Sequence, residues 1–572
     1  MPYMPTTTTA ALAVAGLAGG YATLYATVSL FRWLHRLFFP LCPILRRQPP
    51  LRRRLRIAVI GGGVGGTALA HWLRELYGDD LELTIISDGP IGGRCQSVCV
   101  EGRRYEGGAA IISELNEYLR SFLKKLRLKE KYFASVNVPL GIYDGRDFLV
   151  READEREAPL GISCLAVAFT IARFAARYGV RSLVRLKGLL RHPAAPNFEK
   201  LYRELEAGRV FDTPEEILHT LGPECLALTR QCAASWLCRE RPIGGGVGRR
   251  MVEELVSTGM RCNYGGQGCE ALHAFCGLVS IAGGLASRCF AVRGGNAQIP
   301  DGLLRLAAPQ RQRLHSTARS VRREIARDGS GGWVVEVEEG AAAEAMKGSG
   351  SPAPSRPFSS EGPFDLVVIA HPLERSCVAI DGGGELRPPA ASGRFRRCVA
   401  HFVRGVLRPA YFHRASDAAG DVGAPPPLPG EILTSDGSER TVPFYSIGLQ
   451  TAVDVEDEAE ARTLVRAALR GSEATWKIFA PAPLTSEQLD ALFARRVGEP
   501  RVLDWFAYPQ YELPQKLSPF VLDPPEASLL YLNAIEQAAS AMEMSIISAR
   551  NAANLVARFV DRHRVDQGGT IF

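Results

Sequence analysis

The sequence lacks the residue patterns that usually identify a metal site or a disulfide framework. Its 13 cysteines form no Cys-x-x-Cys pair and are not accompanied by closely spaced histidines. We therefore expect no metal site and mostly reduced, structural cysteines, with at least one free thiol because their number is odd. The chain also lacks an Asn-x-Ser/Thr sequon, which is compatible with a body that never enters the secretory lumen.

Acidic residues and lysine are absent from the first 56 residues. Eight arginines lie there, so the formal net charge of +7 leaves a net charge of −1 for the rest of the chain. The main body is therefore nearly neutral, and its charge gives no reason to expect binding to nucleic acid.

One long apolar run stands in this acid-free segment. Ala10 to Phe31 is rich in Ala and Gly, carries no charge and is about as long as a bilayer-spanning helix. Arginines follow the run and none precedes it, unlike the usual signal peptide. The positive-inside tendency would place the following body on the cytoplasmic side. We expect residues 1–55 to be a membrane anchor with an Arg-rich linker; a signal peptide and an organelle transit peptide are the alternatives.

A glycine loop follows directly. The apolar stretch Ile57 to Ile60 predicts a buried strand, and a helix is expected from about Val64. Between them, Gly61 allows a tight turn, Gly63 lets the backbone approach a pyrophosphate, and Gly66 lets the helix pack on the strand. This arrangement predicts a dinucleotide site.

The second strand of the unit is predicted at Leu81 to Ile86. An acidic residue is expected at its end, where it would bind a ribose hydroxyl. Ser87 occupies that position and Asp88 comes one residue later. We expect the ribose contact at Asp88.

Two further Gly-rich segments indicate which dinucleotide is bound. Gly92-Gly93-Arg94 places an arginine and free backbone N–H groups beside a pyrophosphate, and a glycine pair ending at Gly108 lets backbone run against a ring system. Simple nicotinamide dehydrogenases do not need these contacts, whereas flavoproteins of the amine-oxidase type bury the whole FAD. We therefore expect FAD rather than NAD.

The C-terminal region completes the expected cofactor site. An apolar strand at Leu529 to Leu532 breaks at Asn533, and a helix rich in small residues is expected after it, with Ala538 to Ala541 crowding its start. Unpaired N–H groups at such a start favour an electron-rich atom. The expected cofactor contacts are Gly61, Gly63, Gly65, Gly66, Asp88, Gly92, Gly93, Arg94, Gly108, Asn533, Ala541 and Met542, with the N–H groups near the last two facing the flavin ring.

Short motifs outside these loops are spread from about residue 56 to residue 555. They are Tyr105-Glu106, Leu115-Asn116, Arg177-Tyr-Gly179, Glu215-Glu-Ile-Leu-His219, Asn263-Tyr-Gly265, Arg293-Gly-Gly-Asn296, Ile369-Ala-His-Pro-Leu373, Trp476-Lys-Ile-Phe479, Ala507-Tyr-Pro-Gln-Tyr511, and Asn533 with Glu536-Gln-Ala-Ala-Ser-Ala-Met-Glu-Met-Ser545. Together with the glycine loops they resemble the prenylcysteine oxidase (prenylcysteine lyase) family of FAD-dependent thioether oxidases. The chain departs from the family pattern at Ser87, Ala109 and Ala534.

The resemblance implies a particular chemistry. Such an enzyme oxidises the allylic carbon of an S-farnesyl or S-geranylgeranyl cysteine, water adds to that carbon, and the adduct collapses to cysteine and a prenyl aldehyde. Dioxygen reoxidises the flavin and yields hydrogen peroxide; the flavin carries the redox step and the protein orients the substrate. The resemblance also implies an endomembrane or lysosomal location, because the animal members are lysosomal.

Catalytic residues do not emerge from the sequence. Tyr264, Tyr508 and Tyr511 are candidates for the substrate face of the flavin, although core packing is the expected role of each taken singly. Lone histidines are expected to be structural. The apolar segment Cys164 to Phe174 predicts a buried core helix, with a lipid-tail channel or a membrane-resting helix as alternatives.

The expected fold is α/β, a Rossmann-type FAD-binding domain of the amine-oxidase kind interleaved with a mixed α+β substrate domain. The expected segments are the N-terminal segment (1–55), the first cofactor-domain segment (56–128), a mostly helical substrate region (129–288), the second cofactor-domain segment with a disordered insert at 341–363 (289–375), substrate-domain strands (376–510) and a closing strand and helix (511–572). The alternative functions are another flavin oxidase or desaturase of a hydrophobic substrate, such as an amine, a carotenoid precursor or a porphyrinogen, and an inactive flavin-binding membrane protein.

Overall fold

The fold was analysed in a computed structural model of the 572-residue chain. The structure describes residues 48–132, 138–153, 163–189, 194–239, 246–285, 288–325, 331–340, 358–376, 378–382, 386–387, 394–413, 427–438, 441–524 and 526–566. The predicted membrane segment at Ala10 to Phe31 lies outside these residues. Among the described residues, no helix is both long and apolar enough to cross a bilayer.

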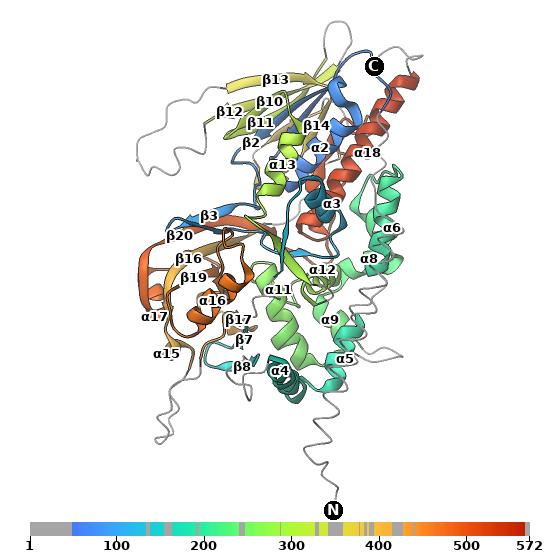
Figure 1. The fold of residues 1–572 in the computed structure, drawn as a ribbon. Coiled ribbons are helices and arrows are strands. Elements are labelled where there is room, and N and C mark those ends of the chain that lie inside the picture. Colours follow the sequence, from blue (N-terminus) through green and yellow to red (C-terminus); the bar gives the residue numbers. More distant parts are fainter. Residues whose placement is uncertain are drawn as a thin grey trace, which may run out of the picture.

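A five-stranded parallel sheet forms the cofactor half (Figure 1). In spatial order its strands are β10 (Arg311–Leu314), β2 (Leu81–Ser87), β1 (Leu55–Ile60), β14 (Leu366–Ile369) and β21 (Leu529–Tyr531). β1 and β14 are almost wholly apolar and buried, as expected for parallel strands covered on both faces. This sheet confirms the predicted Rossmann-type half and shows that it is assembled from both ends of the chain.

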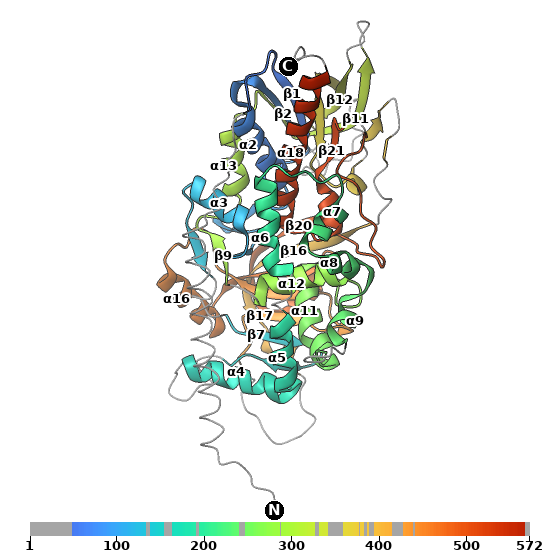
Figure 2. The same cartoon turned by 90° about the vertical axis from the view of Figure 1, so that its right-hand side faces the viewer.

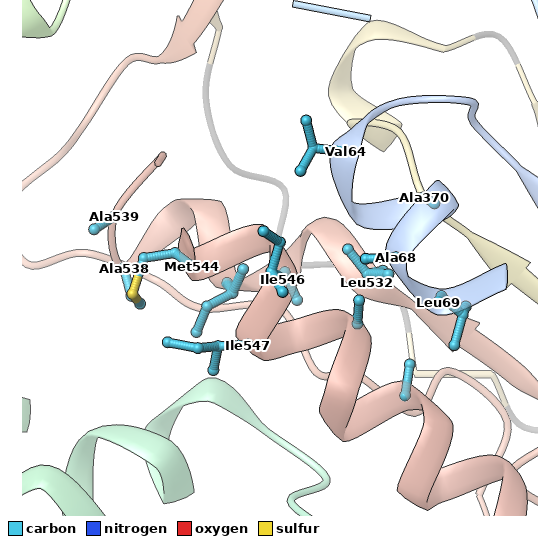
Figure 3. Close-up of a cluster of buried hydrophobic side chains, with 14 of the residues drawn as sticks. Val64, Ala68, Leu69, Ala370, Leu532, Ala538, Ala539, Met544, Ile546 and Ile547 are labelled. Carbon is cyan, nitrogen blue, oxygen red and sulfur yellow. The ribbon is translucent and has the colours of Figure 1, made fainter. Parts of the chain in front are cut away.

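Helices cover this sheet. They are α2 (Val64–Tyr77), α3 (Glu117–Lys125), α13 (Gln298–Ala307) and α18 (Met542–Asp566). Figure 3 shows Val64 and Ala68 of α2 in one buried cluster with Leu532 and with Ile546 of α18. Small side chains at this crossing let the first and last helices of the described chain pack closely.

An antiparallel sheet lies beside the Rossmann sheet. Its strands, in order, are β13 (Phe358–Phe364), β12 (Gly331–Glu339), β11 (Ser316–Ile325) and β15 (Ala379–Asp381), the last of which pairs with β11 in parallel. The prediction of a disordered insert at 341–363 is wrong for residues 358–363, because they belong to β13, which pairs with β12. Its remainder, 341–357, lies outside the described residues.

The substrate half is built on a seven-stranded mixed sheet. In order, its strands are β20 (Phe493–Pro509), β16 (Phe395–Leu407), β19 (Ala474–Ala480), β18 (Ser446–Gln450), β17 (Glu431–Thr434), β7 (Leu140–Tyr143) and β8 (Phe148–Arg151). Small sheets connect the halves: β3 (Ser97–Val100) with β4 (Arg103–Glu106), and β5 (Ile112–Ser113) with β9 (Cys289–Val292) and β6 (Glu130–Tyr132). The segment 129–288 therefore opens with three strands before it becomes helical.

The remaining described helices lie beside the seven-stranded sheet or against α18. They are α4 (Ser163–Tyr178), α5 (Val180–Leu189), α6 (Ala194–Glu206), α7 (Pro214–Leu221), α8 (Pro223–Ala227), α9 (Ala233–Cys238), α10 (Arg249–Met251), α11 (Ser257–Asn263), α12 (Ala274–Leu285), α15 (Pro409–Phe412), α16 (Glu458–Leu469) and α17 (Ser486–Leu492). Figure 2 shows α4 and the Rossmann sheet at opposite ends of the molecule.

The prediction of a buried core helix at 164–174 is wrong. Val167, Phe169 and Ile171 of α4 are exposed to solvent. The solvent-facing side of a helix can be predicted only when polar residues form a stripe along it. This segment is apolar on nearly every face, so its sequence cannot distinguish a buried helix from one at the surface.

Candidate functional site

The first glycine loop has the geometry that close backbone approach requires. Gly61 has φ +126°, and a Cβ there would overlap the carbonyl of Ala370. A Cβ on Gly66 would overlap the carbonyl of Gly61. At Gly63 the Cβ direction meets no protein atom within 4 Å, so this glycine faces open space at the start of α2.

The Gly-Gly-Arg turn lies against that loop. Gly92 donates its N–H to the carbonyl of Gly62 at 2.9 Å, and it forms a β-bridge with Gly63. Gly92 and Gly93 have φ +107° and +55°, a region that other residues seldom occupy. The two predicted phosphate-facing segments therefore form one surface.

Arg94 binds neighbouring protein groups. Its guanidinium pairs with Glu536 and donates to the carbonyl of Ala507 at 2.7 Å and to Ser540 Oγ at 3.4 Å. The side chain thereby joins the glycine turn to the end of β20 and to the segment before α18. A contact of Arg94 with the pyrophosphate stays a prediction.

The second glycine pair is fixed from both sides. A Cβ on Gly108 would overlap the carbonyl of Arg94 and approach Trp505 to 2.6 Å. The carboxylate of Glu106 accepts from the N–H of Asn296 at 2.7 Å, and Asn296 Nδ2 donates to the carbonyl of Ala109 at 2.8 Å. Burial raises the pKa of Glu106 to about 7, opposed by the bond from Asn296.

The C-terminal segment differs in detail from the prediction. A 3₁₀ helix spans Leu532–Gln537, and α18 begins only at Met542. Ala538 and Ala539 are fully buried in the core before the helix starts, so they do not line its open end. Ser540 and Ala541 are half-buried, and with Met542 they form the accessible start of α18.

A buried carboxylate holds the start of α18. Glu543 accepts from the N–H groups of Tyr118 and Leu119 at 2.8 and 3.0 Å and from the hydroxyl of Tyr202 at 2.8 Å. The two N–H groups belong to the first turn of α3, whose free donors favour an anion. Burial nevertheless raises the pKa of Glu543 to about 7.

The strand end that would bind a ribose carries Ser87, which is buried, and Asp88, which is exposed. Ser87 lies next to the glycine loop, since a Cβ on Gly62 would come within 3.0 Å of its hydroxyl. The structure places Asp88 just beyond β2, and its ribose contact stays a prediction.

The residues fit a bound dinucleotide. The open space at Gly63 is where a pyrophosphate would approach, and the free N–H groups of the first turn of α2 favour a phosphate there. Asn533 Nδ2 donates to Glu536 at 2.9 Å, yet Asn533 Oδ1 and the second oxygen of Glu536 are buried without a protein partner. Buried polar atoms left without a partner indicate that a further group is bound there.

The three predicted tyrosines come together. The ring of Tyr264 lies 5.2 Å from that of Tyr508 and 5.7 Å from that of Tyr511. Gln267 connects the two chain segments, because its amide donates to the carbonyls of Tyr264 and Pro509 and accepts from the N–H of Tyr511. Burial raises the pKa of all three hydroxyls, so they stay protonated at neutral pH.

Tyr511 and Tyr508 have different surroundings. The Tyr511 hydroxyl donates to the carbonyl of Glu536 and accepts from the N–H of Ser540, both at 3.0 Å. Tyr508 keeps accessible surface between its buried neighbours Ala507 and Pro509. Tyr511 therefore positions the C-terminal segment, whereas Tyr508 is partly exposed.

Several residues of this site do not emerge from the sequence. Glu536 and Glu543 stand within a family motif. A carboxylate near the start of a helix also indicates a favourable interaction with the helix dipole. Lys477 also stands within a family motif, and its charge in an otherwise mostly apolar strand is a second signal. Glu431 carries no such signal.

The remaining described surface offers no competing centre. No group of three or more potential metal ligands occurs among the residues the structure describes, and ten of the described cysteines are free thiols. A hollow of 280 Å³ is lined by residues that include Leu407, Leu469 and Trp476. None of its lining residues belongs to the glycine loops or to the tyrosine cluster.

Comparison with known proteins agrees with this layout. The profile of the prenylcysteine lyase family matches residues 166–567, and that of an NAD(P)-binding Rossmann-like domain matches residues 59–126. Prenylcysteine oxidase 1-like from Bos taurus is 28% identical over 526 residues, which cover 90% of this chain and 93% of the relative. Prenylcysteine oxidase 1 from Homo sapiens is 29% identical over 539 residues, which cover 91% and 92%.

The solved structure of putrescine oxidase bound to putrescine has a TM-score of 0.50 to this chain at 15% identity. The match covers 89% of this chain and 100% of that one. At this identity the likeness shows the fold alone, which confirms the predicted α/β architecture of the FAD-dependent amine-oxidase kind.

Proposed function

The chain belongs to the prenylcysteine lyase family, and we propose that it is an FAD-dependent oxidase that cleaves the thioether of S-prenyl-L-cysteine. The reaction consumes the thioether, O₂ and water and releases cysteine, a prenyl aldehyde and hydrogen peroxide. The prenyl chain is farnesyl or geranylgeranyl.

The observation that carries the proposal is the direct contact of remote family motifs. Arg94 of the N-terminal region donates a hydrogen bond to Ser540 and pairs with Glu536 of the C-terminal region. Tyr264, from the middle of the chain, lies against Tyr508 and Tyr511. A likeness confined to the first glycine loop would support only a dinucleotide-binding protein.

The chain's own residues have three tasks in this reaction. The glycine segments would hold the pyrophosphate of FAD, and the start of α18 with Asn533 would hold its ring system. FAD, when bound, accepts the two electrons of the allylic C–H bond and is reoxidised by O₂. The tyrosine cluster orients the thioether and excludes bulk water, so that one water molecule adds to the oxidised carbon.

A flavin spectrum and an anaerobic titration test the proposal. The purified full chain should show a flavin absorption band, and farnesylcysteine added without oxygen should bleach it. This anaerobic step should form one farnesal for each flavin bleached. Readmitted oxygen should restore the band and yield hydrogen peroxide in an amount equal to the farnesal. A protein without flavin, or a flavin bleached by an amine or a polyene but not by farnesylcysteine, would contradict the substrate assignment.

For the location we propose attachment to an endomembrane or lysosomal membrane through residues 1–55. The apolar run Ala10 to Phe31 and the arginines that follow support this. Carbonate extraction of cell membranes tests it, because an anchored protein stays in the pellet. A protein recovered only in the soluble fraction would contradict the anchor.

A further inference from the structure

A buried lysine lies in the substrate half on the face of the sheet that is turned toward the tyrosine cluster. Lys477 is 5% exposed and sits in the middle of β19. Its ammonium donates to the carbonyl of Glu106 at 3.0 Å and lies near the rings of Phe402 and Phe479. Among the residues the structure describes, Lys477 forms no ion pair, and Glu106 is the carboxylate that most favours its charged form.

A carboxylate stands two strands away on the same face. Glu431 of β17 pairs with Gly448 of β18, which pairs with Lys477, so the two charged residues flank that glycine. A Cβ on Gly448 would come within 2.5 Å of the Glu431 carboxylate, so this carboxylate extends over Gly448 toward Lys477. The backbones of β17 and β19, which have β18 between them, are about 10 Å apart. The distance between the two charged groups is shorter, because the Glu431 side chain extends toward Lys477.

The two charged residues lie near the tyrosine cluster. Cys262 of α11 contacts Ser446, which precedes Gly448 by two residues in β18. A Cβ on Gly265, next to Tyr264, would lie 3.4 Å from the ring of Tyr508 and 3.8 Å from Cys398 of β16. Glu431 keeps accessible surface although Gly430 and Ile432 beside it are buried. Both charged residues thus lie on a face of the sheet that adjoins the tyrosine cluster.

Burial destabilises the charged forms of both Lys477 and Glu431. Burial lowers the pKa of Lys477 to about 8 and raises that of Glu431 to about 7. A ligand that brings one negative and one positive group would stabilise both charged forms.

We propose that Lys477 and Glu431 bind the amino-acid end of the substrate, with Lys477 at its carboxylate and Glu431 at its ammonium. This inference rests on the proposed function and narrows the substrate to a free zwitterionic amino-acid thioether. A prenylated peptide or a carboxyl methyl ester lacks one of the two charges.

Binding of a saturated analogue tests the assignment independently of turnover. S-dodecyl-L-cysteine lacks the allylic carbon and is not cleaved, and its methyl ester and N-acetyl derivative each remove one charge. Titration calorimetry on the full-length flavoprotein should show at least about tenfold tighter binding of the free amino acid than of either derivative.

The variants separate the two contacts. Lys477→Met should abolish discrimination against the methyl ester only, and Glu431→Gln should abolish discrimination against the N-acetyl derivative only. Gly448→Ala, which displaces Glu431 without removing a charge, should act like Glu431→Gln. Lys200→Met, at an exposed lysine, is the matched control and should bind as the wild type does.

The outcomes distinguish this proposal from the proposed function. Wild-type affinities that are equal for the three ligands, or a Lys477→Met variant that still rejects the ester, would overturn the head-group assignment. The protein could instead prefer S-dodecyl-L-cysteine over its two derivatives while farnesylcysteine fails to bleach its flavin. That result would support the head-group site and contradict the prenyl substrate.

A second surface carries an independent inference. Five large apolar side chains on α4 and α5 are between 43% and 64% exposed: Val167, Phe169, Ile171, Val180 and Val184. The two helices contain no acidic residue and five basic ones, Arg173, Arg177, Arg181, Arg185 and Lys187. Arg177 pairs with Glu254, so the other four supply the positive charge. Exposed apolar side chains among positive charges are typical of helices that lie in the interface of an anionic bilayer.

We infer that α4 and α5 rest on an anionic lipid surface. Hydrogen exchange of the full chain tests this locally, because an N-terminal anchor would not protect these helices. Vesicles of phosphatidylcholine with phosphatidylserine should slow exchange in peptides from 163–189 at least about threefold, and Val180→Asp with Val184→Asp should remove that protection. Equal exchange with and without vesicles would overturn the inference.

Discussion

The guanidinium of Arg94 and the carboxylate of Glu536 form an ion pair between residues 442 positions apart in the chain. Glu536 is buried and also accepts from Asn533. Arg94 belongs to the turn that lies on the first glycine loop, and Glu536 belongs to the 3₁₀ helix that leads to α18. The pair therefore joins the two ends of the chain at the cofactor site.

Removing the carboxylate should destabilise the protein. Glu536→Ala leaves the guanidinium of Arg94 without its partner, and we expect the free energy of unfolding to fall by about 2 kcal/mol, reduced by the partial exposure of Arg94. Urea denaturation measures this. Glu536→Gln, whose amide oxygen still accepts from Asn533, should lose less. Equal stability of the alanine variant and the wild type would show that the pair contributes little.

Two glycines of one loop should respond differently to the same change. Gly66→Ala places a methyl group on the carbonyl of Gly61, so we expect it to lower the stability of the cofactor-free protein by about 1–3 kcal/mol. Gly63→Ala meets no protein atom and has φ −74°, so its unfolding free energy should change by less than about 0.5 kcal/mol.

Cofactor affinity separates the same pair of variants. The methyl group of Gly63→Ala would occupy the space of the pyrophosphate and should weaken FAD binding at least about tenfold. The measurement is flavin retained after dialysis, with denaturation of the apoprotein alongside. A Gly63→Ala variant that retains FAD like the wild type would place the pyrophosphate elsewhere.

The tyrosine hydroxyls offer a second matched pair. Tyr511→Phe removes the bonds to Glu536 and Ser540, and we expect a loss of about 1–2 kcal/mol in unfolding free energy. Tyr508→Phe removes a hydroxyl that has no hydrogen-bond partner among the described residues, so stability should be kept while the KM for the thioether changes. If the effects are reversed, Tyr511 rather than Tyr508 faces the substrate.

Acid should destabilise the protein through a buried histidine. His273 Nδ1 accepts from the N–H of Cys276 and Nε2 lies 3.2 Å from the carbonyl of Gln537, an arrangement that suits the neutral ring. Burial lowers its pKa from 6.5 to about 4. As pH falls below 6.5 the unfolded chain gains a proton that the folded protein does not, so stability decreases toward pH 4.

The variant His273→Gln should isolate this effect. Between pH 7 and pH 5 its loss of unfolding free energy should be smaller than that of the wild type by about 2 kcal/mol. The comparison is needed because Glu543, with its pKa raised to about 7, acts in the opposite direction. His219→Gln, at an exposed histidine, should follow the wild type; identical pH profiles for all three would contradict the prediction.

The elements of the fold that follow local rules can be predicted from the sequence. The strand before Gly61, the helix after it and the second strand follow from apolar runs and glycine spacing. The start of α18 comes later than the sequence predicts, because Ala538 and Ala539 favour a helix in isolation while burial in the core holds them outside it. The exposure of α4 could not be predicted, because its apolar composition suits a helix in the core as well as one at the surface.

The sequence by itself determined the dinucleotide loop and the family. Both depend on residues that are close together in the chain: glycines that allow a positive φ and a close backbone approach, and short motifs. Only the tertiary structure decided what meets that loop. The parallel order β1-β14-β21 places the end of the chain beside its beginning, and strand pairing across the second sheet places Lys477 and Glu431 on either side of Gly448. Such meetings depend on which strands become neighbours, and hydrophobic periodicity along one strand carries no information about its partner.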